Sequence, residues 1–186
     1  MRNIGDQDEN SDRVLLHIKE NPGCYLRQIK NCLRLSMGSI QYHLNKLEKE
    51  GKITSQRSGL HKHYFPIGVF KENEKEIMRY LTLETSREII MFITEQGNPT
   101  QTDIVKEIDI SSSSINWHLK RLLSSNLIEE TKDGKFKRYA LNPEIGSMYV
   151  GKLLKNYYPG IWDKWSNRLA EMFLNLYPID GTKEKY

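Results

Sequence analysis

The chain has 186 residues, of which 38% are hydrophobic and 28% charged, and its net charge at pH 7 is +4. This composition is typical of a globular protein that is large enough for two small domains, and no apolar run is long enough to span a membrane. We therefore expect no membrane partner, and because residues 1–11 are polar and acidic we expect a frayed tail there and a cytoplasmic location.

An internal repeat organises the chain. With a shift of 75 residues, SIQYHLNKLEKEGKI at 39–53 aligns with SINWHLKRLLSSNLI at 114–128, and the match runs from Val14/Ile89 to Tyr64/Tyr139. Many of the matched positions are apolar, which indicates a shared core. The repeat predicts two copies of one small fold, at 12–70 and 84–144.

Each copy is predicted to open with a helix, because its apolar residues recur at helical spacing. In the first copy Ser11 or Asp12 is the expected N-cap, and in the second copy Thr85 or Ser86. Turns rich in Asn, Pro and Gly are expected to end both helices.

Two further helices follow in each copy. The second helix is short, and a capping-box pattern precedes it at 100–103. The third is expected to begin after an N-cap at Ser36 or Ser111 and to end at Gly51 or Asn126, residues that tolerate a left-handed backbone.

A basic β-hairpin completes each copy. Short strands are expected at 53–56 and 63–65 and again at 128–131 and 137–141, around turns that contain Gly. A helix, a helix-turn-helix and a two-stranded wing are the elements of a winged helix-turn-helix module. The predicted fold class is therefore mainly α with small β wings (α+β), with two tandem modules and C-terminal helices.

The remaining segments are predicted to be helical. Residues 71–83 form a connector with an apolar side, and residues 145–178 form two helices interrupted near Pro159, before a tail at 179–186. The aromatic C-terminal helices either cap the second module or form a homodimer interface, since such surfaces suit both burial and association.

The two copies differ in charge. Residues 13–70 contain ten Lys/Arg and three Asp/Glu, whereas residues 84–144 contain eight and ten. The first copy is therefore the part of the chain expected to attract a polyanion.

The third helix of each copy carries the candidate reading surface. Ile40, Leu44 and Leu47 define its buried stripe, and the opposite arc has no acidic residue. The candidates are Gly38, Ser39, Gln41, Tyr42, Asn45, Lys46 and Lys49 in the first copy, and Ser112, Ser113, Asn116, Trp117, Lys120 and Arg121 in the second. Asn and Gln can pair with adenine edges, while Lys and Ser mostly contact phosphates. A polar helix face that is merely solvated is the alternative.

The wings carry the second group of candidates. These are Arg57, His61, Lys62 and His63 in the first wing, and Lys132, Lys135, Lys137 and Arg138 in the second. Such residues could contact phosphates or enter a minor groove, and Lys62 and Lys137 are the strongest candidates because the repeat matches them. Charges that serve only solubility are the alternative.

No metal site, cofactor site or catalytic constellation is expected. His43 and His118 sit at the rim of the buried stripe, where a neutral packing histidine is the usual role. Cys24 and Cys32 have neither zinc-site nor redox-motif spacing, and we expect reduced thiols. The absence of a nucleophile elbow, phosphate loop or paired carboxylates argues against an enzyme.

The pattern S-x-x-S-I-x-Y-H-L-x-K-L-E-x-x-G-x-I, followed by G-x-x-K-x-Y, resembles ArsR-like and MarR-like winged-helix regulators, especially archaeal tandem proteins. The resemblance covers about residues 12–143. It implies recognition helices at 38–49 and 112–124, and wings at 56–63 and 132–138. The chain lacks the paired cysteine ligands of metal-sensing ArsR proteins, so the resemblance does not extend to metal regulation.

Together these features predict a DNA-binding transcriptional regulator that reads double-stranded DNA with two recognition helices and basic wings. A protein-interaction module of transcription or replication machinery is the alternative, because winged helices also serve as docking domains. The acidic balance of the second copy supports that alternative, whereas an exposed aromatic residue such as Trp117 suits a partner groove as well as a sugar-phosphate wall.

Overall fold

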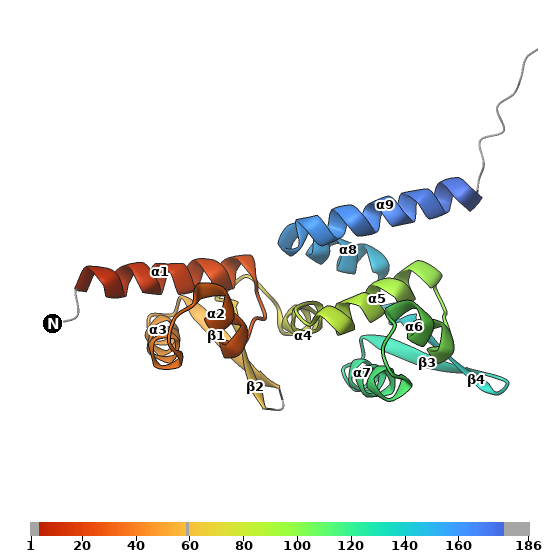
Figure 1. Cartoon of the computed structure of the whole chain (residues 1–186), viewed down its shortest axis with the longest axis horizontal. Helices are drawn as coiled ribbons and strands as arrows, with labels where there is room; N and C mark the ends of the chain where they lie inside the picture. The colour runs from red at the N-terminus through yellow and green to blue at the C-terminus, as the bar shows by residue number, and fades with distance from the viewer. Residues whose placement is uncertain (1–3, 59, 177–186) are drawn as a thin grey trace, which may run out of the picture.

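The computed structural model describes residues 4–58 and 60–176, which form two winged helix-turn-helix modules, a connecting helix and two C-terminal helices (Figure 1). The first module comprises α1 (Ile4–Glu20), α2 (Leu26–Leu33), α3 (Met37–Lys49), β1 (Ile53–Ser58) and β2 (His61–Pro66). The second comprises α5 (Glu84–Gln96), α6 (Gln101–Ile108), α7 (Ser112–Ser124), β3 (Ile128–Asp133) and β4 (Phe136–Leu141). The connector is α4 (Glu72–Leu81), and α8 (Ser147–Tyr157) and α9 (Pro159–Leu176) follow the second module. The predicted fold class is confirmed.

The repeat is visible in the cores of the two modules. Matched apolar side chains are buried in both copies, and they include the pairs Val14/Ile89, Ile40/Ile115, Leu47/Leu122 and Tyr64/Tyr139. Each wing is an antiparallel hairpin, with Ile53 opposite Pro66 in the first and Ile128 opposite Leu141 in the second. Residues at matched positions of the repeat therefore form the core in both modules.

The predicted ends of the third helices are confirmed. Ser36 Oγ accepts a hydrogen bond from Ser39 N–H at 3.2 Å, and Ser111 Oγ accepts one from Ser114 N–H at the same distance. Just after these helices the backbone turns left-handed, with φ of +67° at Gly51. These caps fix where each third helix begins and ends.

The predicted start of the first helix in each module is wrong. α1 already begins at Ile4, so residues 4–11 are helical where a frayed tail was expected. Ser11 lies inside α1 and is buried, and α5 begins at Glu84, before Ser86. Both serines face the module interior, so neither side chain is available to cap its own helix.

The C-terminal helices pack on the second module. The chain turns at Tyr158, and Pro159 is the first residue of α9, a position where its missing N–H costs nothing. Leu154 and Trp165 are buried in the same core as the second module, which supports the capping alternative for this segment. The expected tail at 179–186 lies outside the described residues.

No helix within residues 4–58 and 60–176 combines the length and the apolar character needed to cross a bilayer.

Candidate nucleic-acid interface

Both third helices lie along one edge of the molecule. In the view of Figure 1, α3 and α7 are on the lower side together with the tips of both hairpins, and α8 and α9 are on the opposite side. No other element of the described chain covers this lower edge in that view. The arrangement leaves both predicted reading helices accessible to a large ligand.

The candidate residues lie at the surface. The exposed ones are Gly38, Gln41, Tyr42, Asn45, Lys49, Arg57, His61, Lys62, Ser112, Ser113, Trp117, Lys120, Lys132, Lys135 and Lys137. The half-buried ones are Ser39, Lys46, Asn116, Arg121 and Arg138. The structure therefore brings the helix candidates of each module together on one face.

An aromatic ring stands at the centre of each reading face. Tyr42 and Trp117 occupy matched positions, and each side chain is 53% exposed. Each ring meets the following histidine edge-on, with centroids 5.3 Å apart for Tyr42 and His43 and 4.8 Å apart for Trp117 and His118. The Arg121 guanidinium lies 4.6 Å from the centre of the Trp117 ring, so the second face presents a stacked cation and aromatic pair.

The two histidines behind these rings are packing residues. His43 is buried, and His118 is half-buried with its Nδ1 3.0 Å from Ser86 Oγ. Burial lowers the pKa of both imidazoles, and the neighbouring Lys46 and Arg121 lower it further. Both rings are therefore neutral near pH 7.

The strongest wing candidates are already ion-paired. Lys62 Nζ lies 2.8 Å from Glu48 Oε2, which reaches out from α3, and Lys137 Nζ lies 2.8 Å from Glu130 Oε1 on the adjacent strand. Both lysine side chains remain about half exposed. A phosphate would have to compete with these carboxylates for the ammonium groups.

His63 does not belong to the exposed surface, which corrects the expectation from the sequence. Its side chain is buried, and Nδ1 donates a hydrogen bond of 2.7 Å to the Gly23 carbonyl. Burial lowers the pKa of His63 to about 4. His61, two residues earlier on the strand, is exposed and lies against the ring of Tyr25 with centroids 4.8 Å apart.

Three cations that were not predicted from the sequence lie on α2 and in the turn before α3. Arg27 and Lys30 are exposed on α2, and Arg34 is exposed in the turn that follows. No ion pair among the described residues involves these side chains. The surplus of positive charge in residues 13–70 was the available signal, but no motif singled them out.

The second module differs at this place. Its α6 segment carries Asp103, Glu107 and the left-handed Asp109, which matches Arg34. Acidic side chains therefore stand among the charges on the helix-turn-helix of the second module, whose α6 carries one exposed cation, Lys106.

Within the described residues, no group of three or more His, Cys, Asp or Glu side chains could hold a metal ion. Cys32 is an exposed free thiol, and burial raises the pKa of the Cys24 thiol to about 12.

Two family models match the chain. A model described as an N-terminal HTH domain matches residues 8–78, and one described as winged helix-turn-helix DNA-binding matches residues 82–129. The two matches fall on the two halves of the repeat.

Curated relatives match part of the chain. An uncharacterized HTH-type transcriptional regulator MJ1398 from Methanocaldococcus jannaschii is 25% identical over 129 residues, which are 69% of this chain and 32% of that protein. The arsenical resistance operon repressor of Escherichia coli is 31% identical over 70 residues, which are 38% of this chain and 60% of the repressor. The chain thus spans about a third of the length of the first relative.

Among solved structures, HlyU from Vibrio cholerae in its reduced form has 18% identity and a TM-score of 0.40, over 46% of this chain and 88% of that one. The homodimeric winged helix-turn-helix DNA-binding domain of a Mycobacterium bovis protein has 13% identity and a TM-score of 0.37, over 59% of this chain and 95% of that one.

Proposed function

We infer that this chain, which belongs to the winged helix-turn-helix DNA-binding proteins, acts as a transcriptional regulator that reads double-stranded DNA with α3, α7 and both wings. The observation that supports this most is the repeated, exposed reading face. The matched helices α3 and α7 lie along one edge of the molecule (Figure 1). Their exposed residues are polar, cationic and aromatic, and their apolar sides are buried. The curated relatives are named as transcriptional regulators, in agreement with the expectation that the chain is not an enzyme.

We assign most of the electrostatic attraction to the first module. Arg27, Lys30 and Arg34 stand beside α3 without carboxylate partners among the described residues, and Arg57 is exposed on the wing. In helix-turn-helix proteins the first helix crosses the phosphate backbone while the second enters the major groove. The cations on α2 would therefore contact phosphates, while Gln41 and Asn45 would face base edges.

The test is the salt dependence of binding to a random-sequence duplex. Arg27→Ala should lower the slope of log affinity against log salt by about 0.9, because one phosphate contact is lost. Lys164→Ala is the matched control, since Lys164 is exposed and belongs to α9. The helix α9 lies on the opposite side of the molecule from α3 and α7 (Figure 1). No binding at low salt, or equal slopes for both variants, would contradict the proposed surface.

The alternative of a protein-interaction module has one specific observation in its favour. In the second module, Lys137 and Arg138 are paired with Glu130 and Asp133, so fewer wing cations are left for phosphates. Gel shifts with random duplex, for the whole chain and for Trp117→Ala, would separate the two functions. A docking protein would bind no DNA in either form.

A homodimer through the C-terminal helices and a cytoplasmic location remain predictions. Met148 on α8 is 88% exposed and could contribute to such an interface. Trp165 is buried in the core of this chain and therefore does not face a partner. Sedimentation equilibrium of the wild-type chain and of Met148→Glu would test the dimer. A monomer at all concentrations would exclude it.

A further inference from the structure

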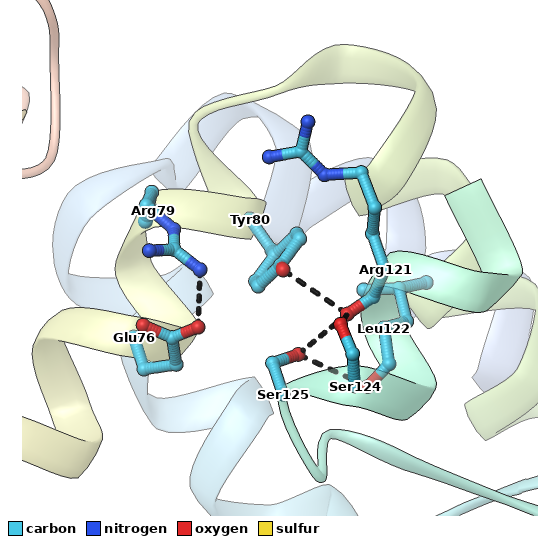
Figure 2. Close-up of polar contacts among 7 residues, drawn as sticks. All are labelled: Glu76, Arg79, Tyr80, Arg121, Leu122, Ser124 and Ser125. Carbon is cyan, nitrogen blue, oxygen red and sulfur yellow. Dashed lines mark hydrogen bonds and ion pairs between the residues drawn. The ribbon is translucent and has the colours of Figure 1, made fainter. Parts of the chain in front are cut away.

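The connector α4 is bonded to the reading helix of the second module. The Tyr80 hydroxyl donates a hydrogen bond of 3.1 Å to the Arg121 carbonyl, which lies in the last turn of α7 (Figure 2). The same carbonyl accepts hydrogen bonds from Ser124 Oγ at 2.8 Å and Ser125 Oγ at 3.1 Å. Tyr80 is only 3% exposed, so water competes little for this bond. The C-terminal end of the second reading helix is thus fastened to the connector.

The same C-terminal end of the connector, at Thr82, is also fastened to the first module. Thr82 Oγ1 donates to the Met78 carbonyl at 2.9 Å and also lies 3.2 Å from the Pro22 carbonyl, in the turn between α1 and α2. Gly23 is packed so closely that an added Cβ would lie 3.1 Å from Thr82 Oγ1 and 3.2 Å from the Met78 carbonyl. This turn therefore rests directly on the end of α4.

Strand β2 of the first wing also packs against the turn at Gly23 and against the core that contains the connector. The Gly23 N–H donates to the Tyr64 carbonyl at 2.9 Å, and Phe65 is completely buried in the core cluster that contains Met78 and the second module. Strand β2 thus belongs to the first module and is also anchored against the connector.

The helix α8 and Tyr158, the residue that follows it, also contact the connector and Thr82. The Tyr158 hydroxyl lies 3.1 Å from Thr82 Oγ1, and the Tyr149 hydroxyl donates to the Glu74 carboxylate. The rings of Phe70 and Tyr157 are 5.2 Å apart. Contacts at Glu74, Tyr80 and Thr82 therefore hold α4 to the second module and to the C-terminal helices, and the Pro22–Gly23 turn fastens the first module to its C-terminal end.

We propose that this junction sets the separation of α3 and α7, and that Tyr80 and Thr82 are its positioning residues. The protein then selects DNA in which two sub-sites lie at one spacing. The proposal rests on the proposed function. Paired helix-turn-helix units bind sub-sites whose separation reflects protein geometry, and a rigid connection penalises every other spacing, whereas a flexible linker tolerates many.

The experiment begins with a pool of random-sequence duplexes long enough to span several helical turns. Enrichment with the wild-type chain gives the two sub-sites and their preferred spacing. Affinities are then measured for that duplex, for versions whose spacer changes in single base pairs up to half a helical turn, about five base pairs, and for a duplex with one sub-site. Wild type should show one optimum and lose at least about tenfold at half a turn.

The double variant Tyr80→Phe, Thr82→Val removes both hydroxyls and keeps the shapes of the side chains. It should flatten the spacing profile to within about threefold and leave the affinity for one sub-site unchanged. Thr94→Val is the matched control, because Thr94 Oγ1 also donates to the carbonyl four residues back, at 2.7 Å, but within α5 alone. This control should keep the wild-type profile.

A second measurement reports on the free protein. Spin labels on the exposed Cys32 and on Glu129→Cys, in the second module, should give a narrow distance distribution in wild type and a broader one in the double variant. Cys24 is buried and should not be labelled.

The possible failures are distinguishable. Enrichment of no duplex by wild type would overturn the proposed function. Binding that tolerates every spacing equally would overturn the fixed junction alone. A wild-type spacing profile and a narrow label distance in the double variant would overturn the roles of Tyr80 and Thr82.

Discussion

Ser86 and His118 are joined by a hydrogen bond of 3.0 Å that ties α5 to the reading helix of the second module. The matched residues of the first module, Ser11 and His43, are both buried, yet Ser11 Oγ and His43 Nδ1 have no hydrogen-bond partner within the described residues. One interaction is thus made in one copy of the repeat and not in the other.

This difference predicts opposite outcomes for the same substitution in the two modules. Ser86→Ala leaves His118 Nδ1 without its partner and should lower the free energy of unfolding by about 1 to 3 kcal/mol. Ser11→Ala removes a buried hydroxyl that makes no hydrogen bond among the described residues, and should be neutral or slightly stabilising. Urea unfolding of both variants checks this, and equal losses would show that the first pair is also bonded in solution.

His63 predicts a loss of stability in mild acid. Burial lowers its pKa from 6.5 to about 4, so between these values the unfolded chain binds the proton more readily than the folded chain. The stability is fully present above pH 6.5, and its His63 component of roughly 3 kcal/mol is lost as the pH falls to about 4. Urea unfolding at several pH values should show a weaker acid dependence in His63→Gln, and an unchanged dependence would assign the effect to other groups.

Glu48→Gln should strengthen DNA binding. The change removes the charge that pairs with Lys62 at 2.8 Å, and an amide oxygen can still accept the hydrogen bond from Ser55 Oγ. The freed ammonium group would then neutralise a phosphate, and the salt slope should steepen by up to about 0.9. Glu130→Gln is the matched change for Lys137, and unaltered slopes in both variants would place the two wings away from the DNA.

The left-handed residues after α3 and α7 predict changes in stability of opposite sign. Asn126 has φ of +58°, and Asn126→Gly should raise the free energy of unfolding by a few tenths to about 1 kcal/mol. An added Cβ at Gly51 meets nothing within 4 Å, so Gly51→Ala should cost about 1 kcal/mol through backbone strain alone. Thermal unfolding measures both, and a stabilising Gly51→Ala would refute the argument.

Local patterns determined the fold. The caps at Ser36 and Ser111 and the buried stripe of the third helix depend on residues close in the chain, and the structure confirms each of them. Helical spacing and capping are properties of a few consecutive residues, which is why sequence suffices for them.

Only the tertiary structure decided which polar groups are free to act. His63 is buried and bonded to the Gly23 carbonyl, 40 positions earlier in the chain, and Lys62 is paired because Glu48 reaches across from α3. The contact between Tyr80 and Arg121 joins residues 41 positions apart. Such partners are set by how whole elements pack, which depends on the shape and burial of the complete chain, and no local pattern in the sequence specifies them.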